Sequence, residues 1–205
     1  MKTQLSPLDA AWQTLHKAGV ISPDASMASP EILITLVDSP LGPLLLGAVT
    51  KGLVLCSFFD DGRALVDLGK IATRLRARVQ QGESPFFTSV QVYLEAYFAG
   101  EIPLLDVPLI LTGTPFQVKA WDYLLTIPHG ETRSYAQQAV AVENPRGVRA
   151  VAQANGRNPL PVLVPCHRVV GSDGTLTGYS SGLWRKRSLL ILEGALSEGA
   201  QRVHR

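Results

Sequence analysis

Three apolar runs in the first third of the chain, residues 32–37, 44–49 and 53–59, have the length and composition of β-strands. Glycine and proline residues separate the first two runs, and Lys51-Gly52 separates the second from the third. Short apolar runs divided by turn residues are typical of consecutive antiparallel strands. The pattern therefore predicts a small antiparallel meander.

The next segment has a helical period. Between residues 64 and 80, apolar side chains recur every three or four positions and predict an amphipathic helix that packs on the sheet. Ser84-Pro85 supplies a cap and a first-turn proline for a second helix, which Gly100 ends. We therefore expect an α+β domain over residues 31–110. The N-terminal extension before it, residues 1–30, holds one possible short helix around residues 8–17.

Two capping boxes follow. Thr114 and Gln117 begin a helix that we expect to reach about residue 127, and Ser134 and Gln137 begin a short helix to about residue 142. Asn144-Pro145 is expected to cap a third helix, which runs to residue 156. Two short helices joined by a turn of three or four residues, the second helix basic, have the spacing of a helix-turn-helix.

The pattern after this helix pair is shorter and richer in proline. Residues 162–164 predict a short buried strand, residues 169–170 predict a strand followed by a turn, and residues 183–193 predict a last helix closed by Gly194. The domain organisation that we expect is therefore an extension over residues 1–30, a domain over 31–110, a second domain over 111–197 and a tail over 198–205.

Composition changes this picture little. With 46% hydrophobic and 18% charged residues, the chain has the make-up of a globular protein. Its longest apolar stretch, residues 41–49, is far shorter than the ~20 residues of a membrane helix, and the N-terminus lacks the apolar segment of a secretory signal. We therefore expect an intracellular protein of the cytoplasm or nucleoid, with no membrane partner.

Charge is distributed unevenly. Residues 1–112 carry 8 Lys and Arg against 11 Asp and Glu, whereas residues 113–205 carry 11 against 6. Between residues 146 and 187, seven cations accompany a single acid, Asp173. Such a run is usually a solvated face, but it is also the surface that a polyanion would bind. Nucleic acid is therefore the first partner to test.

The chain has only two cysteines, too few for a disulfide framework or a Cys-rich zinc site, and we expect no metal. Cys166 stands between Pro165 and His167 in a basic stretch, where the restrained backbone, a proton acceptor and positive surroundings favour the nucleophilic thiolate. A small buried core residue is the alternative. Cys56 lies in an apolar run, and we assign it to core packing.

The segment Pro165-Cys166-His167-Arg168-Val169-Val170 resembles the O6-alkylguanine-DNA alkyltransferases, specifically the bacterial Ogt and C-terminal Ada type. The resemblance extends over about 85 residues, from Gly113-Thr114-Pro115-Phe116-Gln117 through Ser134-Tyr135 and Asn158-Pro159 to Leu192-Glu193-Gly194. It implies an α+β protein with a ribonuclease H-like N-terminal domain, built on a small antiparallel sheet with helices. The C-terminal domain would be mainly helical, with a winged helix-turn-helix.

The resemblance also implies a reaction. Cys166 would attack the alkyl carbon on O6 of a damaged guanine in double-stranded DNA and keep the group, so that each molecule acts once. His167 would accept the thiol proton through a water, Glu193 would orient the imidazole, and Tyr135 would donate a hydrogen bond to the leaving guanine. Asn158 would tie the recognition helix to the active-site turn. No cofactor is implied, and we expect a monomer that also accepts O4-alkylthymine.

DNA binding follows the same resemblance. An alkyl group on O6 is buried in the duplex, so the nucleotide must be rotated out of the stack. Arg149 would enter the stack from the minor groove. The other residues expected to contact DNA are Ala150, Ala152, Gln153, Gly156, Ser134, Tyr135 and Arg168. The substrate pocket would be lined by Pro161, Val169, Tyr179, Ser180, Ser181 and Gly182, with the loop at residues 179–180 as a lid and the backbone of Cys166 and Val169 reading the guanine edge.

Two other functions fit the residues. A Cys-His hydrolase would use the same pair of side chains but turn over many times. A winged helix-turn-helix regulator without chemistry would prefer one operator sequence. The zinc-bound cysteine cluster of the Ada regulator is missing from this sequence, so the resemblance implies neither phosphotriester repair nor methylation-triggered transcription. Alkyltransferase-like proteins carry tryptophan at the nucleophile position, and Cys166 argues against that function.

Overall fold

The computed structural model describes residues 13, 14, 17, 19, 30–59, 62–200, 202 and 203. The chain divides into two compact units, Met1–Thr112 and Gly113–Arg205. The short helix expected around residues 8–17 falls mainly outside the described residues. None of the described helices is long and apolar enough to cross a membrane.

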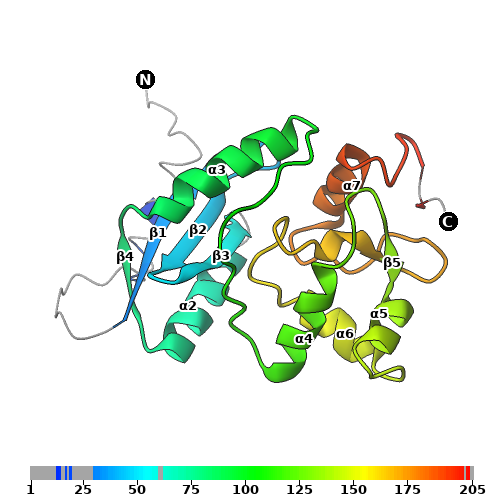
Figure 1. Ribbon diagram of the computed structural model, residues 1–205, viewed down its shortest axis with the longest axis horizontal. Coiled ribbons are helices and arrows are strands. Elements are labelled where there is room, and N and C mark those ends of the chain that lie inside the picture. Colours follow the sequence, from blue (N-terminus) through cyan, green and yellow to red (C-terminus); the bar gives the residue numbers. More distant parts are fainter. Residues whose placement is uncertain are drawn as a thin grey trace. The chain divides into compact units, whose positions relative to one another are not determined.

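The first unit contains a four-stranded sheet in the order β3-β2-β1-β4 (Figure 1). Strands β1 (Glu31–Val37), β2 (Leu44–Val49) and β3 (Gly52–Phe58) pair in antiparallel register, which confirms the predicted meander. A fourth strand, β4 (Arg78–Gln81), pairs in parallel with β1. The sheet is therefore mixed rather than purely antiparallel.

The prediction of one helix over residues 64–80 was wrong in its last turn. Helix α2 (Arg63–Leu75) ends where Arg76 takes a left-handed backbone with φ of 50°, and the Ala77 amide closes the helix by donating to the carbonyl of Ala72 at 2.9 Å. Val79 continues the apolar spacing of the helix, yet its side chain packs from β4 into the same core. Periodicity alone could not separate these two conformations.

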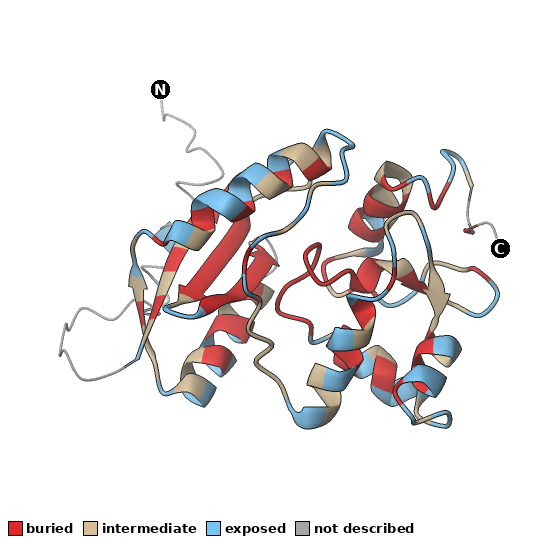
Figure 2. Cartoon of the chain, in the orientation of Figure 1, coloured by how far each residue is buried: buried red, intermediate tan, exposed pale blue. Residues whose placement is uncertain are grey.

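Two helices cover the sheet. Figure 1 shows α2 and α3 (Pro85–Phe98) on either side of it. Strands β2 and β3 are buried at nearly every position, as Figure 2 shows. The N-cap Ser84 and the first-turn Pro85 are as predicted, with the Ser84 hydroxyl accepting from the amide of Phe86. A sheet buried on both faces has continuous rather than alternating apolar strands.

The second unit is mainly helical. It contains α4 (Pro115–Leu124), α5 (Tyr135–Ala141), α6 (Val148–Asn155) and α7 (Leu183–Leu192), together with a short parallel pair of β5 (Arg133–Ser134) and β6 (Val169–Val170). Both capping boxes are present as predicted, at Thr114 with Gln117 and at Ser134 with Gln137. The third predicted helix begins later than expected, at Val148, with Gly147 rather than Asn144 as its cap.

Buried polar bonds fasten the three helices α4, α5 and α6 together. The amide of Gln138 donates to the carbonyl of Ala120 at 2.9 Å and to the side chain of Asn155 at 3.1 Å, and Asn155 donates back at 2.7 Å. The Trp121 indole donates to the carbonyl of Ala154 at 2.9 Å. Since buried amides must be paired, these bonds restrict how α6 can sit against its neighbours.

Residues 162–164 are buried, as predicted, but they form turns rather than a strand. Val162 has φ of 73°, a left-handed conformation that is rare for a β-branched residue, and the Val164 amide donates to the carbonyl of Leu160 at 2.8 Å. Proline-imposed extended conformations around this segment suggested a strand. The tight turn instead returns the chain toward the segment that holds Cys166.

Candidate active site and nucleic-acid interface

Cys166 begins a single 3-10 turn, η1 (Cys166–Arg168), directly after the tight turn. The side chain of Asn158 fixes this approach, because its amide donates to the carbonyl of Val164 at 2.7 Å and its oxygen accepts from the amide of Leu160 at 3.0 Å. Asn158 follows the end of α6 and is itself 2% exposed. One buried carboxamide thus links the end of the recognition helix to the chain just before the cysteine.

His167 lies against Glu193, at the end of α7. The two atoms Nε2 of His167 and Oε1 of Glu193 are 2.9 Å apart, and both side chains are fully buried. Nδ1 of His167, the other ring nitrogen, is buried and has no hydrogen-bond partner within the protein. Because Glu193 is ionised, Nε2 carries the ring proton and Nδ1 is left as an acceptor.

Arg168 completes this arrangement, and here the sequence-based expectation needs correction. Its guanidinium donates two bonds to Glu193, both 2.8 Å long, and a third to the carbonyl of Ile127 at 2.6 Å. Only 11% of the side chain is exposed. These bonds direct the guanidinium of Arg168 into the protein. The predicted contact of Arg168 with DNA does not fit this orientation.

The charges of this group follow from burial and pairing. Burial acts to raise the pKa of Glu193, but the hydrogen bonds from His167 and Arg168 and the charge of Arg168 outweigh it and hold that pKa well below its usual range. Burial lowers the pKa of His167, and Glu193 opposes this only in part. His167 is therefore a neutral imidazole near pH 7, the form that can accept a proton.

Tyr135 stands at the start of α5 and is buried. Its hydroxyl donates to the carbonyl of Gly178 at 2.9 Å, with the carbonyl of Thr177 at 3.1 Å. Burial, and after it the charge of Cys166, raise the pKa of Tyr135, so the phenol keeps its proton. The interaction with Cys166 also places the two side chains in one electrostatic environment. Tyr135 is thus a proton donor beside the cysteine.

Lys186 belongs to this environment, and sequence reasoning missed it. The side chain is fully buried, and its ammonium donates to the carbonyls of Val169 and Thr177, the latter at 2.6 Å. Its nitrogen also lies 5.5 Å from the centre of the Tyr135 ring. Burial lowers the pKa of Lys186 to about 8, although the charge of Cys166 acts to raise it. A buried cation next to a thiol favours the thiolate.

The basic run between residues 146 and 187 separates into two groups. Its first three arginines are exposed around α6, and they are Arg146, Arg149 and Arg157. Its last four cations are engaged inside the second unit, and they are Arg168, Arg185, Lys186 and Arg187. A polyanion can therefore use the charge around α6, whereas the last four cations of the run bond within the protein and do not extend that surface.

The predicted recognition surface lies on one side of α6. Arg149 and Gln153 are exposed, and Ala152 and Gly156 are partly exposed beside them. Ala150 is exposed as well. Ser134, by contrast, uses its side chain to cap α5, accepting from the amide of Gln137 at 3.1 Å. The surface that α6 offers thus carries the long side chains of Arg149 and Gln153 among small residues.

The residues predicted to line the substrate pocket differ in exposure. Those that are buried are Pro161, Val169, Tyr179 and Ser181, and those that are partly exposed are Ser180 and Gly182. Gly178, just before them, has φ of 62°, and a side chain there would collide with the Tyr135 hydroxyl, 2.6 Å from where its Cβ would lie. The lid and the phenol are therefore in direct contact.

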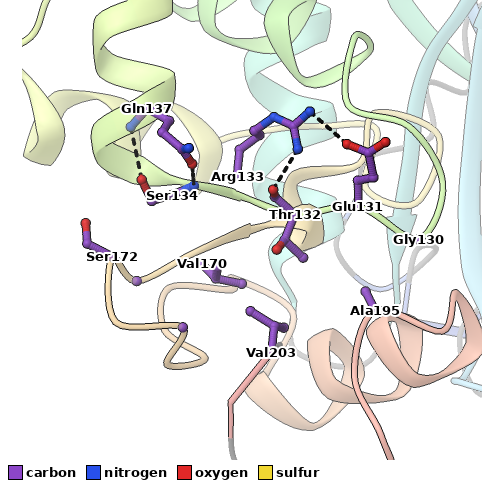
Figure 3. A pocket seen from close by; sticks show the side chains of 12 residues that line it. Gly130, Glu131, Thr132, Arg133, Ser134, Gln137, Val170, Ser172, Ala195 and Val203 are labelled. Atoms are coloured by element: carbon purple, nitrogen blue, oxygen red, sulfur yellow. Dashed lines mark hydrogen bonds and ion pairs between the residues drawn. The ribbon is translucent and has the colours of Figure 1, made fainter. Parts of the chain in front are cut away.

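A cavity of about 660 Å³ opens next to the β5–β6 pair (Figure 3). Its wall includes an ion pair between Glu131 and Arg133, 2.8 Å long, and its lining also includes Val170, Ala195 and Val203. Of the predicted site residues only Ser134 lines it. It is therefore distinct from the group around Cys166.

The second cysteine has different surroundings. Cys56 is fully buried in β3, where burial raises the pKa of its thiol to about 12 and makes it unreactive. In the part of the chain that the structure describes, no group of three or more His, Cys, Asp and Glu side chains is arranged to hold a metal ion.

Comparison with known proteins identifies both units. The family profile of the 6-O-methylguanine DNA methyltransferase ribonuclease-like domain matches residues 32–111, and that of the DNA binding domain of the same family matches residues 115–195. The chain is 44% identical over 160 residues to a methylated-DNA–protein-cysteine methyltransferase of Methanosarcina acetivorans, covering 78% of this chain and 97% of the relative. A Mycobacterium tuberculosis relative of the same name is 45% identical over 159 residues, covering 77% and 89%.

Solved structures agree. The crystal structure of Mycobacterium tuberculosis OGT in complex with DNA is similar to this chain with a TM-score of 0.66 and 41% identity, over 80% of this chain and 92% of that one. An O6-methylguanine-DNA methyltransferase from the hyperthermophilic archaeon Pyrococcus kodakaraensis matches with a TM-score of 0.55 and 28% identity, over 80% and 99%.

Proposed function

Because this chain belongs to the 6-O-methylguanine DNA methyltransferase family, we propose that Cys166 is the sulfur on which it takes up the alkyl group of a damaged base. The protein repairs DNA by moving the alkyl group of O6-alkylguanine to a cysteine of its own. Of its two cysteines, Cys56 is sealed in the core of a sheet. Only Cys166 stands beside a base, a buried cation and a phenol, and this observation carries the proposal.

The reaction is a single displacement. The thiolate of Cys166 attacks the alkyl carbon, a carbon–sulfur bond forms, and the bond from that carbon to O6 breaks with its electrons on the guanine. The product is a thioether on the protein and a restored guanine, which takes up one proton. Nothing in this sequence of bonds regenerates the thiol, so each molecule reacts once.

The thiolate forms by proton transfer to His167. Its Nδ1 is the acceptor, reached through a water, while Nε2 remains bonded to Glu193. Arg168 keeps Glu193 ionised, and Glu193 holds the ring in the tautomer that leaves Nδ1 unprotonated. Lys186 supplies a positive charge that lowers the free energy of the thiolate. Glu193 therefore orients His167 as the base, and the charge of Lys186 stabilises the Cys166 thiolate.

Tyr135 assists the leaving group. The guanine departs with a negative charge, and a hydrogen bond from the phenol stabilises it. In the free protein this hydroxyl donates to the lid carbonyl of Gly178. Entry of the base would therefore exchange a bond to the lid for a bond to the guanine.

The domain over residues 111–197 binds the duplex. Arg149 occupies the space of the extruded nucleotide, and the small side chains of α6 allow close approach to the minor groove. We assign the domain over residues 31–110 a supporting role. We extend the substrate range to O4-alkylthymine, and we place the protein in the cytoplasm or nucleoid, where its DNA substrate lies.

Substitution of the two cysteines tests the proposal. We expect Cys166→Ala to abolish transfer of radiolabelled methyl from O6-methylguanine in a duplex while duplex binding persists. Cys56→Ala is the matched control and should retain transfer. Transfer by Cys166→Ala at the wild-type rate would refute the assignment of the sulfur.

A further inference from the structure

Three consecutive cations occupy the third to fifth positions of α7, and the first turn of this helix has no acidic residue. The N-terminal end of a helix carries partial positive charge, so cations there cost free energy unless they have partners. Each of the three donates to a main-chain carbonyl of a different segment. Arg185 donates to Ser181, Lys186 to Val169 and Thr177, and Arg187 to Ala200.

The Arg185 bond holds the substrate lid, which we define as residues 178–182. Its guanidinium nitrogen NH1 lies 2.9 Å from the carbonyl oxygen of Ser181, and Arg185 and Ser181 are 3% and 5% exposed. A hydrogen bond from a charged donor in such a buried place is among the stronger ones in a protein. It fixes the last turn of the lid to the helix that follows.

Trp184 covers this bond from outside. The guanidinium carbon of Arg185 lies 4.4 Å from the centre of the Trp184 ring, although 54% of Trp184 is exposed. The indole also lies against Gly182, since a Cβ on that glycine would come within 3.0 Å of it. An exposed aromatic ring thus contacts both the guanidinium of Arg185 and Gly182 of the lid.

We propose that Arg185 and Trp184 form a latch on the lid, and that this latch limits the size of the alkyl group that the site accepts. The inference rests on the proposed function of Cys166. In the free protein two side chains hold the lid segment, Tyr135 at Gly178 and Arg185 at Ser181. When Tyr135 turns to the guanine, Arg185 remains. A lid that yields to a bulky group must then break the Ser181 bond.

The test compares two substrates in the full-length protein. Single-turnover rates are measured on duplexes carrying O6-methylguanine or O6-benzylguanine, and the benzyl-to-methyl ratio is the readout. We expect Arg185→Met to raise this ratio about fivefold or more, the effect of one buried hydrogen bond. Trp184→Ala should raise it in the same direction, and Arg185→Lys, which keeps a donor, should return it toward wild type.

Arg187→Met is the matched control, because Arg187 occupies the same turn of α7 but bonds to the C-terminal segment at Ala200 instead of the lid. Its ratio should equal that of the wild type. The latch is refuted if Arg185→Met and Trp184→Ala keep a ratio within about twofold of wild type, if the ratio falls, or if Arg187→Met raises it equally. A wild-type protein that transfers neither group would instead refute the function of Cys166, so the two failures are distinguishable.

Discussion

Nε2 of His167 lies 2.9 Å from Oε1 of Glu193, and the guanidinium of Arg168 donates two hydrogen bonds to the same carboxylate. This shared carboxylate decides which nitrogen of the imidazole can act as the base. A neutral glutamine at position 193 could present its amide hydrogens to the ring and select the other tautomer. Glu193→Gln should therefore lower the rate of alkyl transfer by at least about tenfold, with duplex affinity unchanged. Single-turnover kinetics with a separate binding titration measure both quantities.

Arg168 also sets the pH dependence of the reaction. Burial and nearby cations lower the pKa of His167, so the imidazole stays unprotonated, and transfer should persist, as the pH falls below 6.5. In Arg168→Met the guanidinium charge that lowers the pKa of His167 is gone while Glu193 remains bonded to the ring, so the pKa of the imidazole rises. The acid limb of the pH–rate profile should then move to higher pH. An unchanged limb would show that Arg168 does not act through His167.

Lys186 should control the ionisation of Cys166. Its ammonium is charged below pH 8, and its charge interacts with the thiolate. Lys186→Met should therefore raise the pKa of the Cys166 thiol by about one unit or more. Ultraviolet absorbance of the thiolate, recorded against pH in a Cys56→Ala background, measures this shift. Lys119→Met removes an exposed lysine and should leave the titration unchanged.

Arg149 should matter only when a base must leave a duplex. Arg149→Ala should lower the rate on duplex O6-methylguanine by about tenfold or more, since extrusion costs a few kcal/mol, and leave the rate with free O6-benzylguanine unchanged. Arg74→Ala removes an equal charge from α2 and serves as the control. Equal losses on both substrates would contradict a role in extrusion.

The buried amide pair of α5 and α6 should dominate the stability of the helix-turn-helix. Gln138→Leu leaves the amide of Asn155 without its partner and should lower the free energy of unfolding by about 1–3 kcal/mol. Replacing both residues by leucine should cost less than the two single changes combined. Gln91→Leu on the exposed face of α3 is the control and should change stability by less than about 0.5 kcal/mol. Urea denaturation of the wild type and the four variants measures these differences.

The sequence predicted those features of the fold that depend on residues close together in the chain, such as helix starts. The capping boxes at Thr114 and Ser134 began helices where expected, because a side chain that satisfies its own helix end needs no distant partner. Strand β4 was missed because Val79 fits a helical period, and only pairing with β1 makes its backbone extended. The sequence cannot show that pairing directly.

The site was predicted in part for the same reason. The Pro165-Cys166-His167 segment marks a candidate nucleophile and a candidate base from adjacent residues. Arg168 and Lys186, however, look in sequence like members of a basic surface run. Only tertiary structure shows that their donors bind Glu193 and buried carbonyls. One signal in the sequence could have marked Lys186 as a buried cation. It lies on an apolar face of its helix, three positions before Leu189.

The most direct test of the account is a titration of the protein against a duplex with one O6-methylguanine, followed by intact-mass measurement and peptide mapping. We predict that one methyl group is transferred per protein molecule, that transfer then stops, and that the added mass maps to the peptide containing Cys166. Continued turnover beyond one equivalent, or a methyl group found on any other residue, would contradict the account.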